Sequence, residues 1–193
     1  MNIPAIAIPK NLDTPPSLVE CKNDLYEYPH EWPDFVFYGP EGSFEAEISP
    51  VGKAPGILAR LFGGLRQRYM LRFSPPRPFE IAELRAKLKT LIDEDDDCMT
   101  QYHEPEVLKY LLNQCENFAE VLAWGCLTGA LYGNGVNPTL PELCEDASEG
   151  AAPDADELPI ISATGYSGPL SIEHIRECAR GITSESLPDT LEC

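Results

Sequence analysis

The chain has 193 residues, 43% of them hydrophobic, which is enough to bury a core and excludes a wholly disordered polypeptide. Its 32 acidic residues against 14 basic ones give a net charge of −18. This balance argues against a nucleic-acid binder and against adsorption to anionic membranes, because both depend on Lys and Arg. The seven cysteines follow no regular spacing, so we expect no disulfide framework and a cytoplasmic location.

Residues 1–33 are predicted to form an extended, proline-rich arm. Each proline lacks a backbone donor, which disfavours a regular element. The arm is too apolar for a solvated tail, so we expect it to lie on its own domain or on a neighbouring molecule. Its aromatic residues Tyr26, Tyr28 and Trp32 are candidates for binding a partner, and they would serve equally well to anchor the arm to its own domain.

Residues 34–133 are predicted to form an α+β core that begins with a hairpin. Short apolar strands at 34–38 and 43–51 flank the turn at 39–42. A third strand, 66–73, alternates between basic and apolar residues, which predicts one basic face and one buried face.

The basic face of that third strand carries Arg66, Arg68 and Arg72, which are further candidates for partner binding. They lie in the segment 53–89, which has nine bases and two acids and therefore a charge of +7, leaving −25 for the rest of the chain. We expect the acidic loops to neutralise this segment, because dense opposite charges attract within one fold.

Two helices follow in the predicted core. The first spans 79–93 and ends in an acidic run, of which Asp95, Asp96 and Asp97 are candidates for an acidic contact surface. The second, 103–133, is predicted to be one continuous core helix, amphipathic at its start and apolar all round at its end.

That second helix has glycines at positions 125, 129 and 133, which fall on one face. We expect this face to receive a large side chain such as Trp32 or Phe35. A helix from another subunit would also fit, so homo-oligomerisation stays open.

The remainder is predicted to be an acidic flexible loop at 134–158, a strand and a helix completing the core at 159–182, and a loose acidic tail at 183–193. The expected fold is therefore α+β: a small antiparallel sheet of three to four strands packed against three helices, with an N-terminal arm and an acidic C-terminal tail.

Two constellations of side chains could carry chemistry. Cys98, His103, His174 and Cys178 would suit tetrahedral zinc, but neither pair has a CxxC spacing. Cys115 or Cys126 with His103 would suit nucleophilic catalysis, but both cysteines lie on an apolar stripe where a thiolate is disfavoured. The sequence therefore assigns no catalytic, cofactor or metal residue, and buried thiols are the preferred interpretation.

These features favour a non-enzymatic interaction or assembly subunit of a larger complex, with protein partners and no sequence-specific nucleic acid or membrane. Virus and phage particles, in the virion or the host cytoplasm, are a setting where such arms are common. The alternative is an acidic inhibitor, such as an immunity or anti-defence protein, that blocks a basic nucleic-acid-binding enzyme. An enzyme with an unrecognised site is a third hypothesis.

Overall fold

The computed structural model describes residues 1–22, 24–27, 30–51, 68–94, 99–100, 103–131 and 170–192. Its strands are β1 (Asn2–Ile3), β2 (Ala5–Pro9), β3 (Ser17–Val19), β4 (Phe35–Gly39), β5 (Gly42–Val51), β6 (Arg68–Phe73), β7 (Glu185–Ser186) and β8 (Thr190–Glu192). Its helices are α1 (Asp24–Glu27), the 3₁₀ helix η1 (Trp32–Asp34), α3 (Ile81–Glu94), α4 (Pro105–Gln114), α5 (Phe118–Thr128) and α7 (Ile172–Gly181).

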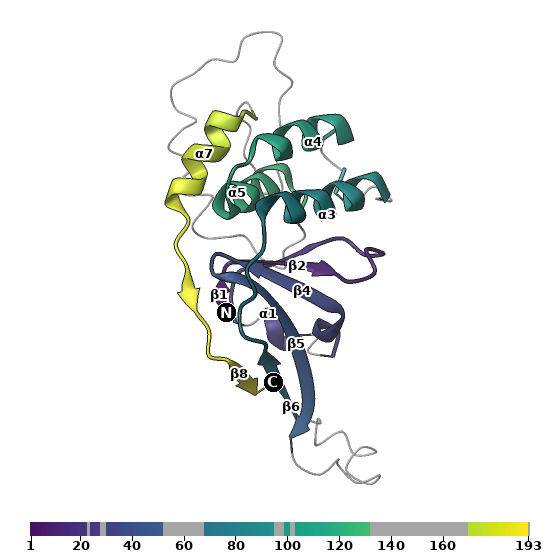
Figure 1. Cartoon of the computed structure of the whole chain (residues 1–193), viewed down its shortest axis with the longest axis vertical. Coiled ribbons are helices and arrows are strands. Elements are labelled where there is room, and N and C mark those ends of the chain that lie inside the picture. The colour runs from purple at the N-terminus through teal and green to yellow at the C-terminus, as the bar shows by residue number, and fades with distance from the viewer. Residues whose placement is uncertain are drawn as a thin grey trace.

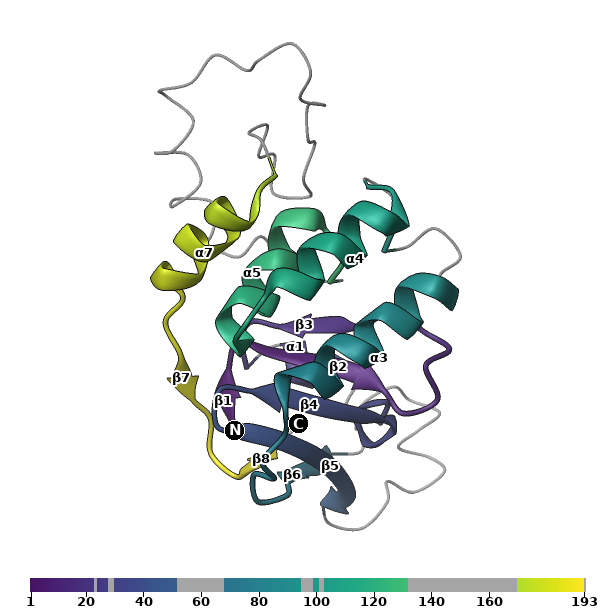
Figure 2. The ribbon, with the colours of Figure 1, turned by 45° about the horizontal axis from the view of Figure 1, so that its top comes forward.

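The predicted α+β class is confirmed, but the predicted number of strands is wrong. The main sheet has six antiparallel strands in the order β3-β2-β4-β5-β6-β8 and curls into half a barrel, while β1 pairs separately with β7. Figures 1 and 2 show α3, α4 and α5 stacked on one side of this sheet, with α7 alongside α5. The additional strands come from the two segments that were expected to be an arm and a tail.

The expected N-terminal arm is wrong because residues 5–9 form an inner strand of the sheet. β2 pairs with β3 on one side and with β4 on the other, so that Ile8 lies opposite Val36. Prolines 4 and 9 lie just before the strand and at its last position. In these places they interrupt little of the hydrogen-bond ladder, so they do not prevent pairing.

The sheet has an apolar core on each face. Ile6, Ile8 and Tyr38 pack with the helices, whereas Phe37 and Leu71 belong to the core inside the half-barrel. The inner core is completed by α1 and η1, which lie on the face away from the large helices. Both faces of the central strands are thus covered, which explains why β2 is an uninterrupted apolar run.

The predicted hairpin is confirmed, and the predicted sides of the third strand are confirmed for Leu71, Arg72 and Phe73. β4 and β5 are joined by a tight turn in which Gly39 pairs with Gly42. Gly42 has φ +152°, and a Cβ there would approach the Arg77 carbonyl oxygen to 2.8 Å, so this position requires glycine. In β6, Leu71 faces the inner core while Arg72 is exposed on the opposite face.

The predicted single helix at 103–133 is wrong, because the chain turns between α4 and α5. The Asn117 side chain caps α5 by accepting a hydrogen bond from the Glu120 amide at 3.0 Å. The Glu120 carboxylate in turn accepts one from the Glu116 amide at 2.7 Å. These bonds satisfy amides that a new helix leaves without partners, and so they favour a break at this point. The predicted change from an amphipathic to a buried helix is nevertheless confirmed.

We expected the glycine face of α5 to receive Trp32 or Phe35, and this expectation is wrong. A Cβ at Gly125 would lie 2.2 Å from Cδ1 of Leu131, so this leucine fills the space. Gly129 ends the helix in the left-handed conformation, with φ 71°, which folds the chain back and brings Leu131 over Gly125.

The C-terminal segment is not the loose tail that was expected. After α7 the chain runs beside the sheet, as Figure 2 shows, and contributes β7 and β8. Leu187 donates its amide to the Met1 carbonyl at 2.9 Å, and both Leu187 and Leu191 join the inner core. The expected loop at 134–158 and the expected strand after it lie outside the described residues. Within the described residues, no helix is long and apolar enough to cross a bilayer.

Candidate functional site

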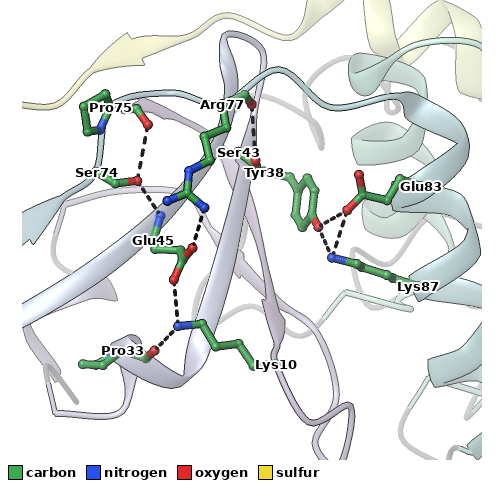
Figure 3. A network of polar contacts seen from close by, with 10 residues as sticks. All are labelled: Lys10, Pro33, Tyr38, Ser43, Glu45, Ser74, Pro75, Arg77, Glu83 and Lys87. Carbon is green, nitrogen blue, oxygen red and sulfur yellow. Dashed lines mark hydrogen bonds and ion pairs between the residues drawn. The ribbon is translucent and has the colours of Figure 1, made fainter.

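A polar network on the sheet connects β2, β5 and the segment after β6 (Figure 3). The Lys10 ammonium donates to the Pro33 carbonyl at 2.8 Å and to Glu45 at 3.1 Å, and Arg77 donates to the other Glu45 oxygen at 2.9 Å. The hydrogen bond and charge of Lys10 hold the pKa of the Glu45 carboxyl below its usual value. Glu45 therefore stays ionised between two cations and acts as a structural link.

Tyr38 joins the sheet to α3 in the second part of this network (Figure 3). Its hydroxyl donates to Glu83 at 3.2 Å and accepts from Lys87, whose ammonium also pairs with Glu83 at 3.1 Å. Burial raises the pKa of the Tyr38 hydroxyl, so the phenol stays protonated and does not act as a base. Its role is to fix α3 over the sheet.

Cys115 lies at the turn between α4 and α5, and its environment is unsuitable for a nucleophile. The thiol is buried and contacts the carbonyl oxygens of Leu111 at 3.5 Å and Glu120 at 3.6 Å. Burial, together with the nearby Glu120 charge, raises the pKa of Cys115 to about 12. The thiol is therefore protonated at neutral pH, which argues against the expected alternative of a Cys–His site here.

The four predicted zinc ligands are only partly brought together. His174 and Cys178 are both buried on α7, with Nε2 and Sγ 3.6 Å apart. His103 precedes α4, its Nε2 is buried without a hydrogen-bond partner, and burial lowers its pKa. Cys98 lies outside the described residues. No group of three or more metal-binding side chains occurs in the part of the chain that the structure describes.

Glu20 and Asp24 are two neighbouring carboxyl groups at the turn after β3. One Asp24 oxygen accepts the amides of Glu20 at 2.8 Å and Cys21 at 2.9 Å. The Glu20 oxygen Oε1 is buried and has no hydrogen-bond partner. Burial and then the Asp24 charge raise the pKa of Glu20 to about 7, so this carboxyl changes its charge near neutral pH.

The residues predicted to bind a partner lie in different environments. Trp32 is only 8% exposed and donates from its indole to the Leu25 carbonyl at 3.2 Å, so it anchors its segment to its own sheet. Tyr26 packs partly against the same core, and Arg72 is exposed on β6. Tyr28, Arg66, the Arg68 side chain and Asp95, Asp96 and Asp97 lie outside what the structure describes.

The outer face of α4 is the most distinctive surface that the structure describes. Tyr110 is 67% exposed and Val107 is 44% exposed, and these are the exposed large hydrophobic residues among the described ones. They lie three positions apart and therefore on one helix face, while Leu108, Leu111 and Leu112 face the core. Figures 1 and 2 show α4 stacked on the outer side of the helical layer. We call this surface, with its flanking polar residues, the α4 face.

The helix that carries the α4 face is held in place by hydrogen bonds from side chains of α3 and α5. Arg85 of α3 donates to the carbonyls of Asn113 at 2.8 Å and Cys115 at 2.9 Å, closing the C-terminal end of α4. The buried indole of Trp124 donates to the Leu108 carbonyl at 3.2 Å. Because these groups fix the backbone of α4, Tyr110 is presented without the entropy loss that ordering a mobile segment would add on binding.

Polar groups surround the two exposed hydrophobic residues. Glu104 and Glu106 are exposed at the N-terminal end of α4. Lys109 pairs with Asp93 of α3, and Lys89 of α3 donates to the Asn113 side chain at the C-terminal end. The apolar pair thus has polar groups around it, among them two acids before Val107 and two side chains that contact α3.

The α4 face was not predicted from the sequence, where neither Val107 nor Tyr110 was singled out. Val107 flanks the core side of this amphipathic helix, so the positions of α3 and α5 decide whether it is covered, whereas Tyr110 lies nearly opposite Leu108 and Leu112. Comparison of the chain with protein-family models, with curated proteins and with solved structures finds no match.

Proposed function

We propose that this protein is a non-enzymatic interaction or assembly subunit that binds a protein partner through the α4 face. The observation that carries the proposal is the pair of exposed residues Tyr110 and Val107 on a helix whose backbone is held by hydrogen bonds from α3. Tyrosine is enriched among the residues that dominate binding energy at interfaces, and a polar periphery around an apolar centre is typical of interfaces.

The chemistry of Cys115 supports a role without catalysis. A Cys115 pKa of about 12 removes the thiolate that a cysteine nucleophile needs. The expected setting in a virus or phage particle depended on an apolar arm that docks on neighbours. Since residues 5–9 and 17–19 are strands of the sheet, that argument gives the setting no support, and the proposal is limited to the interaction itself.

The test is site-specific photo-cross-linking from the α4 face in cells that normally make the protein. A benzophenone amino acid replaces Tyr110 in one variant and Glu177, an exposed residue of α7, in the matched control. We expect a discrete protein adduct from position 110 and none from position 177; a second copy of the chain counts as a partner. Absence of any adduct from position 110 contradicts the proposal.

The alternative, an acidic inhibitor of a basic nucleic-acid-binding enzyme, predicts a different dependence on salt. Its motive is the net charge of −18, since charge complementarity acts mainly on the association rate and is screened by ions. The cross-linking is therefore repeated in a cell lysate at low and at high salt. An adduct from position 110 that still forms at high salt favours the apolar contact through Tyr110. A basic enzyme that cross-links to both positions at low salt and to neither at high salt favours the inhibitor.

A further inference from the structure

We infer that the segment 74–78, between β6 and α3, binds the aromatic-lined groove of a partner domain that recognises polyproline II. The segment reads Ser-Pro-Pro-Arg-Pro, and we call it the proline segment. The inference goes beyond the proposed function, because it concerns a second surface with a partner of defined chemistry and does not depend on the α4 face.

The sequence sets the backbone of the proline segment in an extended conformation. A proline fixes its own φ at about −65°, and the residue before a proline is driven to an extended ψ. Every residue from Ser74 to Pro78 is either a proline or stands directly before one. Both restrictions agree with polyproline II, in which φ is about −75° and ψ about +145°.

The fold holds the proline segment at both ends. Phe73 before it belongs to the inner core, and the ring of Phe79 after it packs edge-on against Tyr38, with 5.0 Å between the ring centroids. Between these anchors, Arg77 exchanges two backbone hydrogen bonds with Ser43, at 2.8 and 2.9 Å. A partner therefore meets an ordered segment, and binding does not carry the entropy cost of ordering it.

The proline rings are accessible to a partner. Pro75, Pro76 and Pro78 are all exposed. A Cβ at Gly42 would lie 3.0 Å from Cβ of Pro76, so the Pro76 ring lies next to the β4–β5 turn. In polyproline II, which has three residues per turn, Pro75 and Pro78 lie on one side about 9 Å apart. This is the P-x-x-P spacing that proline-recognising grooves bind.

The backbone of the proline segment selects an aromatic groove over a partner strand. Prolines 75, 76 and 78 have no amide, so an added strand would find few donors to pair with. Among the described residues, none donates a hydrogen bond to the carbonyls of Pro76 or Pro78. Apolar rings beside free carbonyls suit the side chains of Tyr and Trp, which combine an apolar ring with a hydrogen-bond donor.

A cation lies close to the prolines along the chain. Arg72 is exposed, precedes Pro75 by three residues and makes no ion pair with any residue that the structure describes, although Glu47 lies opposite it on β5. Its guanidinium can bind a carboxylate at one end of the groove. Because the chain carries a net charge of −18, a strongly acidic partner would be repelled, so we expect a single carboxylate there.

The experiment titrates the full chain into purified, isotope-labelled SH3, WW and EVH1 domains, which bind proline-rich segments through aromatic grooves. The set includes domains with a carboxylate at one end of the groove. A contact this short buries less than roughly 1,200 Å², so we expect weak binding. At least one domain should bind with a dissociation constant of roughly 100 μM or below, with NMR shift changes at the aromatic residues of its groove.

Four variants test the residues that carry the contact. Replacing both outward prolines, Pro75→Ala with Pro78→Ala, should lower the association constant at least about tenfold. The control Pro50→Ala removes an exposed proline at the far end of β5 and should leave binding unchanged. Arg72→Glu should weaken binding, whereas Arg180→Glu changes the net charge equally at an exposed site of α7 and should not. Circular dichroism checks that each variant keeps its fold.

Three results overturn the inference: no domain binds at about 1 mM chain, the shift changes lie outside the aromatic groove, or the double proline variant binds no worse than the Pro50→Ala control. The prolines would then only keep the sheet edge from pairing. An Arg72→Glu variant that binds like the wild type overturns the carboxylate contact. A domain that binds the proline segment while position 110 gives no cross-link refutes the α4 face alone.

Discussion

Replacing Gly125 by alanine tests how the end of α5 is packed, because the sign of the effect is informative. In an exposed helix interior this change stabilises a protein by about 1 kcal/mol, since alanine has the higher helix propensity. Here the new Cβ would lie 2.2 Å from Cδ1 and 2.3 Å from Cγ of Leu131, and 3.2 Å from its Cβ. A flexible tip alone could not relieve these contacts, so the leucine or the backbone must move.

The magnitude follows from two opposing contributions. Forcing an extra carbon into a well-packed core costs about 1–3 kcal/mol, and the helix propensity offsets about 1 kcal/mol of this. We therefore expect Gly125→Ala to lower the free energy of unfolding by up to about 2 kcal/mol, with no net stabilisation. For a chain of this length, that lowers the melting temperature by up to roughly 8 °C.

Leu131→Ala provides the matched background. Leu131 is buried, so its truncation should cost about 2–5 kcal/mol. With the leucine side chain gone, Gly125→Ala should be neutral or stabilising, and the cycle should show a coupling of about 2 kcal/mol. Urea unfolding followed by the fluorescence of the buried Trp124 measures all four proteins. Stabilisation by Gly125→Ala in the wild-type background would refute the packing of Leu131 over Gly125.

Three further predictions concern stability and reactivity. The Glu20 pKa of about 7 is above its ordinary value of 4.5, so the stability this carboxyl provides is complete below about pH 4.5 and is lost as pH rises through 7. Glu20→Gln should therefore stabilise the protein by about 1 kcal/mol at pH 8 and little at pH 4, after allowance for partial exposure; equal effects at both pH values in urea unfolding would contradict this. Cys115 should alkylate far more slowly at pH 8 than the exposed Cys21, as peptide mass spectrometry can show, and similar rates would argue against a buried protonated thiol. Asn117→Ala should lower the stability measured by thermal unfolding by about 1 kcal/mol, because it removes the cap of α5. An unchanged stability would argue against this cap.

The parts of the fold that the sequence predicted well have a local pattern. The β4–β5 hairpin has a glycine-containing turn between apolar strands, and β6 alternates between the exposed Arg72 and the buried Leu71 and Phe73. A strand that is covered on one face alternates in this way because successive side chains point to opposite faces. Such a signal needs no knowledge of distant segments.

The missed elements lacked a local signal or had one that was overlooked. Residues 5–9 are buried on both faces, so they do not alternate, and the prolines around them suggested an irregular arm. The break before α5 did have a signal, since Asn117 followed three residues later by Glu120 is a capping pattern. The exposure of Tyr110 also had a signal that was overlooked, since helical spacing places it nearly opposite the buried Leu108 and Leu112.

The pairing of β1 with β7 has a consequence for how the protein folds. The hydroxyl of Ser186 donates to the side chain of Asn2, 184 positions earlier in the chain. Closing a loop of that length costs roughly 4–5 kcal/mol of chain entropy, so these strands should dock after the rest of the sheet has formed. Until then the inner core lacks Leu187 and Leu191 and is open to water. Substitutions that weaken the late-forming pairing of β1 with β7 should therefore accelerate unfolding while leaving the folding rate nearly unchanged.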